Sequence, residues 1–364
     1  MNHIILNEHP DKGLERSWRD MLRRLEMPAH YVAPEYFLEP HWVGKSPFAV
    51  LVSDRGMITA VATGVHSGEV MDCGQPTRPQ VVIEPGPTES AATDELARGL
   101  LKEARDASLI NLYSWTPWKS LERHGYRIRE LEGDVVLDLT QGPDALFNQA
   151  HPTRRRNVRF AVKNGVEVSR ATTDEELREF YDVYQSWLHS PRKNLQEEGI
   201  SFERFLAAQH LTANHCAMVA RAAGKTVAGI MLRFYPGGLL ESAANSSLDE
   251  FLYLKPNDLL LWRATEWGCA QGFRCYSLGA AHPFLRWCGG KVWPIYRHRL
   301  DRTWLRRHDI GETMSEFGRE ALRKMPEPVR DAMRRFRHKA LKSAPPALQA
   351  ERGDASQTTG LEFK

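Results

Sequence analysis

The stretch His151–Val168, HPTRRRNVRFAVKNGVEV, joins a dense cationic run to a change in hydrophobic periodicity. Five of the ten residues from 154 to 163 are basic, namely Arg154, Arg155, Arg156, Arg159 and Lys163. Val158 and Ala161 recur at helical spacing, and Asn164-Gly165 is a typical helix stop. The pattern predicts a short cationic helix that leads directly into a β-strand.

Two interpretations of the cationic helix stay open. Cations crowded on one helix repel each other unless solvent or an anion screens them, so the row is either a solvated face or an anion-binding face. Guanidinium groups bind phosphate in a bidentate fashion. On the second interpretation the candidate substrate-binding residues are Arg155, Arg156, Arg159 and Lys163.

The composition is that of a soluble globular chain with sizeable cores. The sequence has 364 residues, 42% hydrophobic and 26% charged, with a net charge of +3, which does not by itself indicate a nucleic-acid binder. No apolar run is long enough for a transmembrane helix, and charged residues interrupt the N-terminus where a secretion signal needs an apolar core. We therefore expect a cytoplasmic protein. The five cysteines form no CxxC pair, so neither disulfides nor a metal site is expected.

Strand and helix patterns follow each other twice in the same order. Each half shows a meander of strands, a long helix, a strand, a short helix ended by glycine, and a final strand. In the first half the predicted elements are Leu14–Leu25, Phe48–Ser53, Met57–Thr63, Gln80–Ile83, Asp94–Ala107, Leu109–Ser114, Trp118–His124 and Asp134–Leu139. In the second they are Val166–Ser169, Thr173–Leu188, Phe202–His210, Cys216–Ala222, Thr226–Phe234, Leu239–Ala244, Asn257–Gln271, Cys275–Leu278, Pro283–Cys288 and Val292–Leu305.

This internal echo predicts an α/β (α+β) fold of two tandem domains, each with a mixed central sheet flanked by helices. The predicted domains are residues 1–150 and 151–308, with the substrate cleft between them. A basic helical extension over 309–343 follows, and its segment Arg319–Lys342 has nine Lys or Arg against three acids. That helix either docks on the body or makes peripheral contact with a membrane surface or an anionic substrate. Residues 344–364, rich in Pro, Gly, Ser, Thr and Gln, are expected to form a disordered tail.

Three passages together resemble the Fem-type branch of the Gcn5-related N-acyltransferase (GNAT) superfamily. The run from Arg154 to Val166 is similar to that family's R-x-x-I-R-x-A-x-K-x-G-V passage. Residues 254–262, LKPNDLLLW, are similar to its proline-led long helix, and residues 272–279, GFRCYSLG, to its G-x-x-x-x-D-x-G passage. The resemblance covers Arg154 to about Arg302 and implies two tandem GNAT-like domains.

The resemblance also implies an acyltransferase. It would move an acyl group from an activated donor, acyl-coenzyme A, to an amine acceptor; the donor would be a co-substrate, with no permanently bound cofactor. One alternative is an aminoacyl-tRNA-dependent transferase of cell-envelope or peptidoglycan synthesis. Another is a catalytically inactive module of the same fold that binds an anion or a nucleic acid. The expected partners are a small-molecule amine or a cell-envelope precursor, and tRNA for the first alternative.

Two departures from the family concern the expected reacting centre. The family often has Phe-Lys after the glycine-containing strand, whereas this chain has Phe284-Leu285-Arg286, and Ser277 stands where the family has Asp. Arg286 is therefore the candidate cation that binds the donor or stabilises a developing oxyanion. The alternative is that Arg286 forms a surface salt bridge. His282, beside the same turn, is a candidate proton acceptor.

Three further candidates lie on predicted strands. Glu241, between apolar neighbours on Leu239–Ala244, is a candidate general base whose pKa burial would raise, unless it is an exposed strand residue. Asn245 is a candidate for orienting substrate, although turn formation explains it equally well. Tyr276 is a candidate substrate contact; the alternative is that its side chain is part of the core.

Overall fold

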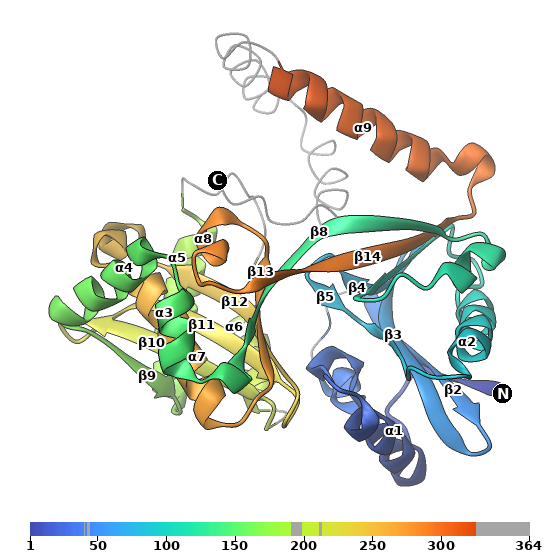
Figure 1. Ribbon diagram of the computed structural model, residues 1–364, viewed down its shortest axis with the longest axis horizontal. Coiled ribbons are helices and arrows are strands. Elements are labelled where there is room, and N and C mark those ends of the chain that lie inside the picture. Colours follow the sequence, from blue (N-terminus) through green and yellow to red (C-terminus); the bar gives the residue numbers. More distant parts are fainter. Residues whose placement is uncertain (40, 42–43, 191–198, 211–212, 325–364) are drawn as a thin grey trace. The chain divides into compact units, whose positions relative to one another are not determined.

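Two series of strands with the same internal order form the sheet of the computed structural model (Figure 1), which describes residues 1–39, 41, 44–190, 199–210 and 213–324. The first series is β1 (Asn2–Leu6), β2 (Lys45–Asp54), β3 (Met57–Ser67), β4 (Val70–Gln75) and β7 (Leu109–Ser114). The second is β9 (Val166–Ala171), β10 (His215–Ala222), β11 (Lys225–Phe234), β12 (Leu239–Ser247) and β13 (Cys275–Ala280). In both series the strands pair antiparallel except for the last pair, β4–β7 and β12–β13, which is parallel.

The two closing strands are exchanged between the halves. β8 (Arg127–Asp138) follows the first series in the chain but pairs with β13, and β14 (Lys291–Asp301) follows the second but neighbours β7. β8 and β14 also pair with each other, so one hydrogen-bonded path runs through both halves. In Figure 1 these two long strands run side by side from one half to the other. Residues Met1–Leu300 accordingly form one compact unit.

Helices cover the sheet and fill its cores. The α-helices of this unit are α1 (Lys12–Arg24), α2 (Glu89–Glu103), α3 (Pro143–Gln149), α4 (Pro152–Lys163), α5 (Asp174–Leu188), α6 (Phe202–His210), α7 (Pro256–Ala270) and α8 (Pro283–Arg286). The 3₁₀ turns are η1 (His30–Val32), η2 (Pro34–Leu38), η3 (Lys119–His124), η4 (Leu139–Gln141) and η5 (Asp249–Leu254). α5 begins at a capping box of Thr173 and Glu176, which satisfies free N–H groups of its first turn. α7 buries Leu259, Leu260 and Ala264 in the second half.

A third core cluster joins the two halves. It packs Trp18 and Met21 of α1 with Val136 of β8, Leu239 of β12 and Cys275 of β13. All five side chains are buried. Because buried apolar area is the main stabilising contribution to a fold, neither half keeps its whole core without the other.

In each half the two parallel strands pair at one end and then diverge, which leaves a gap that we call a fork. In the first half another segment of the chain fills this fork. β4 and β7 pair over Val70–Cys73, and the chain then returns as β5 (Arg78–Pro79) and β6 (Val81–Ile83). β5 pairs with β4, and Gln80 donates its backbone N–H to Tyr113 of β7 while its carbonyl accepts from Thr63 of β3. Residues 78–80 thus lie between the diverging strands β4 and β7 and form backbone hydrogen bonds with both.

In the second fork, no described segment forms backbone hydrogen bonds between the diverging strands β12 and β13. β12 and β13 pair only over Leu239–Glu241 and Cys275–Ser277. A β-bulge follows at once, because Ser242 and Ala244 are paired with successive residues of β11 while Ala243 has no opposite residue. Bulges bend the strand that carries them, so β12 turns away from β13 directly after Glu241. No described strand pairs with that edge of β12 between Ser242 and Ser247.

The predicted fold class, a mixed α/β fold with helices flanking a mixed sheet, is confirmed. Two elements begin earlier than predicted: α2 begins at Glu89 instead of Asp94, and β8 begins at Arg127 instead of Asp134. The pattern also missed β1, β4 and α3, which are short or contain few β-branched residues.

The predicted domain boundaries at 150 and 308 stay a prediction. Residues from Asp301 onward belong to a second compact unit, whose described part holds η6 (Trp304–Arg306) and α9 (Arg307–Lys324). The rest of the predicted basic extension and the predicted tail at 344–364 lie outside the described residues. Among the described helices, none combines the length and the apolar character needed to cross a bilayer.

The strand exchange leads to a prediction about the isolated first half. Residues 1–150 expressed alone should fail to fold, because β7 would lose its neighbour β14 and β8 would lose both of its partners. Unpaired strand edges favour aggregation. We expect an insoluble or unfolded product by circular dichroism, while residues 1–306 stay folded. A monomeric first half with a cooperative thermal transition would contradict the exchange.

Candidate active site

Glu241 is the buried carboxyl at the point where the second fork opens. Its side chain lies on β12 in register with Ser277 of β13, and the residue is 4% exposed. Its Oε2 atom is buried and has no hydrogen-bond partner among the described residues. Burial raises the pKa of Glu241 to about 8, although Arg78 and Arg233 favour the charged carboxylate; Asp134 disfavours it further. Such a carboxyl exchanges a proton near neutral pH.

A second buried carboxyl lies on the other side of Ser277. The Ser277 hydroxyl donates to Oδ2 of Asp134 on β8 at 3.1 Å. Asp134 is fully buried, and its Oδ1 has no partner in the described part of the chain. Burial raises the pKa of Asp134 to about 7, against the opposing effects of the Ser277 hydrogen bond and Arg78. Ser277 therefore contacts Asp134 directly and is the register partner of Glu241 on the neighbouring strand.

The filled fork of the first half supplies a cation to the open fork of the second. Arg78 of β5 donates from Nη2 to the backbone carbonyl of Ala243, the bulged residue of β12. Its guanidinium also lies 5.4 Å from the ring centroid of Tyr31, a cation–π distance. Both halves therefore contribute residues around Glu241, and the predicted substrate cleft between them stays a prediction.

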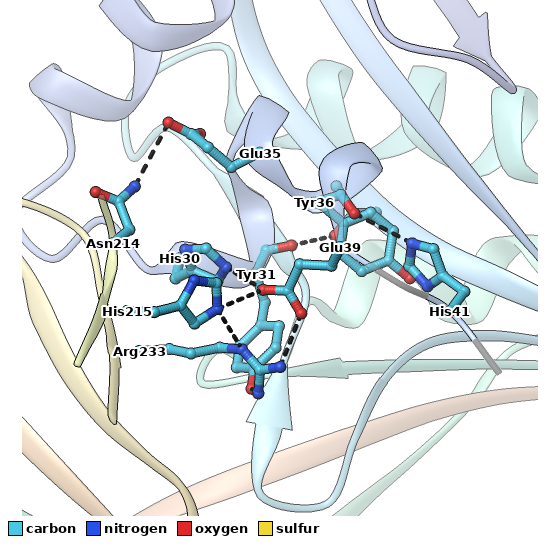
Figure 2. A network of polar contacts seen from close by, with 10 residues as sticks. His30, Tyr31, Glu35, Tyr36, Glu39, His41, Asn214, His215 and Arg233 are labelled. Carbon is cyan, nitrogen blue, oxygen red and sulfur yellow. Dashed lines mark hydrogen bonds and ion pairs between the residues drawn. The ribbon is translucent and has the colours of Figure 1, made fainter. Parts of the chain in front are cut away.

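Next to this cation lies a buried ion pair that spans the halves (Figure 2). Arg233 of β11 donates from Nη2 to Oε2 of Glu39 at 2.9 Å and from Nη1 to the Tyr31 hydroxyl at 2.7 Å. Burial alone would raise the pKa of Glu39, but Arg233 and hydrogen bonds from His215 and His30 outweigh it and hold that pKa well below its usual range. The ion pair is thus charged at neutral pH.

His30, Glu39 and His215 are also a possible ligand set for a divalent cation. Their ligand atoms lie within 4.8 Å of one another, a cluster that the sequence did not predict. The Nε2 atom of His215, however, lies 3.2 Å from Oε1 of Glu39 and 3.0 Å from the Arg233 Nε, and a nitrogen that carries a hydrogen toward Glu39 has no lone pair for a metal. The guanidinium already balances the Glu39 charge, so the arrangement favours an ion pair.

A pocket of about 260 Å³ lies at the first turn of α7, beyond the far end of β12. Its lining includes Asn157 of α4, Lys255, Asn257, and Trp287 after α8. Asn257 donates to the Ser247 hydroxyl of β12 at 3.0 Å, while its own Oδ1 has no partner among the described residues. The N–H groups at the start of a helix favour negative charge. Asp258 also lines the pocket but is paired with Arg154, so Lys255 and the helix start favour an anionic group there.

The cationic helix α4 divides its basic residues between two roles. Arg154 is buried and forms an ion pair with Asp258 of α7 at 2.7 Å; it also donates to the carbonyl of Phe284. It is thus a structural residue that fastens α4 to α7 and α8. The predicted anion-binding residues point elsewhere: Arg155 is half-buried and Arg156, Arg159 and Lys163 are exposed. The Arg159 guanidinium lies 5.3 Å from the Phe147 ring centroid.

Arg286 and His282 are bound into the turn around α8. His282 caps α8 by accepting from the Phe284 backbone N–H at 3.2 Å. Arg286 donates from Nε to the carbonyl of Ala281 at 2.9 Å and from Nη2 to Glu132 at 3.3 Å. The Arg286 side chain is 47% exposed. These contacts anchor both residues in the turn around α8, and their catalytic roles stay predictions.

The substitution Arg286→Ala separates these roles. A half-exposed guanidinium that pairs with an exposed Glu132 contributes little, about 1 kcal/mol or less. We therefore expect turnover to fall by less than about tenfold, the range such an energy allows. Steady-state acyl-transfer kinetics measure this. A hundredfold fall with an intact fold would instead place Arg286 at the reacting centre.

The other two predicted contacts lie on β13 and β12. Tyr276 of β13 is completely buried, and its hydroxyl shares a 2.8 Å hydrogen bond with the Ser242 hydroxyl. Tyr276 thus lies in the core and orients Ser242, and its substrate contact stays a prediction. Asn245 is half-buried on the unpaired stretch of β12, in register with Ile230. Its substrate contact stays a prediction.

Sequence reasoning missed Asp134, Arg78, Arg233 and Glu39. A signal existed for two of them, since Asp134 begins the apolar run DVVL and Arg233 interrupts IMLRF. Lone charges inside apolar strands are rarely buried unless they are paired. Arg78 and Glu39 lie in irregular segments, and only the folded chain brings them to the fork.

Comparison with known proteins agrees with this architecture. Residues 148–286 match the family model of the acetyltransferase (GNAT) domain. FemX is similar in structure, with a TM-score of 0.65 at 12% identity, over 83% of this chain and 98% of the FemX chain. A tandem GNAT protein from the clavulanic acid biosynthesis pathway gives a TM-score of 0.56 at 13% identity, over 83% and 99% of the two chains.

A third similar structure is the C-terminal domain (DUF2156) of a putative lysylphosphatidylglycerol synthetase from Agrobacterium fabrum. Its TM-score is 0.55 at 14% identity, over 79% of this chain and 91% of that domain. A search of curated sequences finds no match. At these identities the solved structures establish the fold alone. Together with the domain match they confirm the predicted Fem-type GNAT architecture.

Proposed function

We propose that this chain, which carries a GNAT acetyltransferase domain in residues 148–286 and has the fold of FemX, is an N-acyltransferase that moves an acyl group from acyl-coenzyme A to an amine. One observation carries the proposal: the unpartnered Oε2 of Glu241 lies buried where β12 leaves β13. The domain match supports acyl transfer in general, and the site suggests the donor.

Glu241 is the proposed general base. An amine attacks an acyl carbonyl only as the neutral base, so its ammonium proton must leave before or during the attack. The Glu241 carboxylate takes that proton, and the neutral amine nitrogen then bonds to the carbonyl carbon. As the bond from carbon to sulfur breaks, the nitrogen loses its second proton, which leaves with the thiolate as the free thiol of the donor. A pKa of about 8 leaves Glu241 mostly protonated at neutral pH, so the base becomes available as the pH rises toward that value.

The unpaired edge of β12 is the proposed seat of the donor. An exposed strand edge offers backbone N–H and C=O groups to an extended amide-bearing chain. From Glu241 to Ser247 the strand spans about 20 Å, at about 3.3 Å per residue. The pocket at the first turn of α7 lies near its far end, because Asn257 contacts Ser247. A thioester with phosphates remote from the acyl group suits this layout.

A second candidate donor, aminoacyl-tRNA, is favoured by a separate observation. Arg156 and Lys163 are exposed on α4, and Asn157 of the same helix lines the pocket. Such cations contact nucleic-acid phosphates without regard to sequence. On this alternative the acceptor would be a cell-envelope precursor rather than a small-molecule amine.

Calorimetric titration of the full chain with acetyl-coenzyme A and with aminoacyl-tRNA at 50 and 200 mM salt distinguishes the donors. We expect acetyl-coenzyme A to bind with a modest salt dependence and to be consumed when a mixture of amines is supplied. Binding of tRNA through several phosphates would fall by orders of magnitude. The double variant Arg156→Ala/Lys163→Ala should spare the first donor and weaken the second.

Two results would contradict the proposal. Binding of tRNA but not of acetyl-coenzyme A would support the aminoacyl-tRNA alternative. Binding of either donor without any turnover over a broad panel of amines would indicate the inactive binding module that the sequence left open.

A further inference from the structure

Asp134 is a buried acid that the proposed reaction does not use. It lies on β8, the strand that the first half contributes beside β13, and Ala280 of β13 is its partner in the register. The side chain is fully buried and half satisfied: Oδ2 accepts from Ser277, whereas Oδ1 has no partner among the described residues. A buried carboxyl oxygen without a partner is costly, so a functional reason for it is expected.

Ser277 connects this acid to the proposed base. Glu241 and Ser277 are directly opposite on adjacent parallel strands, which lie about 4.8 Å apart. A hydroxyl accepts one hydrogen bond while it donates another. Since Ser277 already donates to Asp134, its lone pairs remain for a protonated Glu241. Oε2 of Glu241 has no partner in the part of the chain that the structure describes, and a Glu241 O–H that turns toward the Ser277 oxygen completes a path for one proton to Asp134.

We propose that Asp134 is a positioning residue that shares one proton with Glu241 through the hydroxyl of Ser277. The proposal rests on the acyl-transfer function assigned to Glu241. When the proton lies on Asp134, Glu241 is a carboxylate and ready to receive the proton of the amine. The exchange breaks the O–H bond of Glu241 and forms one at Ser277, while the original Ser277 proton moves to Oδ2 of Asp134. No further reactant is needed.

The charged groups around the pair are consistent with a single shared proton. Arg78 from β5 acts on both carboxyls, and Arg233 of β11 and Glu39 act on Glu241 from the other side. Arg233 and Glu39 neutralise each other as an ion pair, which leaves Arg78 as the balancing cation. Two like charges in one buried site oppose double ionisation, so one ionised and one protonated carboxyl matches the single balancing charge.

Infrared titration of the full chain, labelled with ¹³C in its Asp and Glu carboxyls, tests the pair without any turnover. We expect two coupled steps near neutral pH in the native protein. Asp134→Asn should remove one step and move the Glu241 step down by about half a pH unit or more, because a like charge is lost. Glu241→Gln should remove the other titration step and thereby identifies which step belongs to Glu241. Asp72→Asn, at a carboxyl that burial also perturbs and that Asn111 bonds, is the matched control and should move neither.

Kinetics give a second readout. In Asp134→Asn the apparent pKa of the acid limb of kcat/KM should fall together with the pKa of the Glu241 step. Asp134→Glu should restore part of the native pH profile. If Asp134→Asn fails to fold, Ser277→Ala replaces it. The pKa of the Asp134 step should rise in this variant, because its hydrogen bond is lost. Turnover should fall about tenfold, less than the roughly 10²–10⁴-fold contributed by a direct general base, because Ser277 only relays the proton.

The outcomes separate the two proposals. A Glu241 step that stays in place in Asp134→Asn, or unchanged steps and turnover in Ser277→Ala, would overturn the shared proton. Absence of acyl transfer in the native protein would contradict the proposed function, whereas the infrared titration would still decide whether the two carboxyls are coupled.

Discussion

Glu241→Gln should lower the turnover of acyl transfer by at least a hundredfold and leave the fold intact. Glutamine has nearly the shape of glutamate but cannot accept the ammonium proton, and a positioned general base contributes roughly 10²–10⁴-fold. The substitution should not destabilise the protein at neutral pH, because burial already favours the uncharged carboxyl of Glu241. Single-turnover rates with saturating acyl donor measure the chemical step directly.

The matched control for this variant is Glu132→Gln. Glu132 lies on β8 with a side chain that is 72% exposed, and it pairs only loosely with Arg286. The control should keep native turnover. If Glu241→Gln retained more than about a fifth of the native rate, a general-base role would be excluded, and alignment of donor and acceptor would have to account for catalysis.

Arg233→Met should destabilise the protein by about 3–5 kcal/mol, the usual range when one partner of a buried ion pair is removed. The change leaves the Glu39 carboxylate with hydrogen bonds from His30 and His215 but without its cation. It also removes the link between the 3₁₀ turns of the first half and β11 of the second (Figure 2). Urea denaturation gives the free energy of unfolding.

The double variant Arg233→Met/Glu39→Gln tests whether the loss comes from the unpaired charge. Removing both charges should recover part of the stability, because a buried ion pair replaced as a whole is often nearly neutral. A loss of less than 1 kcal/mol in the single variant would show that Glu39 reaches water when Arg233 is absent. Recovery by the double variant would otherwise show that the loss comes from the unpaired Glu39 charge.

Local periodicity was enough to predict most helices and strands and their repeated order. The strands Thr226–Phe234 and Leu239–Ala244 are close to the observed β11 and β12, because each is a continuous apolar run between turn residues. The exchange of β8 and β14 could not be predicted in this way. It depends on pairing between residues such as Ser277 and Val136 that lie far apart in the sequence.

The candidate site was predicted in part for the same reason. Glu241 was found because it is a charge inside an apolar strand, and its burial is now observed. Arg154 was counted with the cationic row, yet Arg154, Val158 and Ala161 share the buried face of α4. That spacing was present in the sequence and could have identified Arg154 as structural. The position of Arg78, in contrast, follows from residues 78–80 filling the first fork.

The pH dependence of kcat/KM for acyl transfer, measured in parallel for the native protein and Glu241→Gln, tests the central claim most directly. Burial raises the pKa of Glu241 to about 8, and only its ionised form accepts a proton. The native rate should therefore rise with pH through an acid limb with an apparent pKa near 8, and Glu241→Gln should lack that limb. An identical limb in both proteins, or a native limb near the ordinary glutamate value, would contradict Glu241 as the base of this active site.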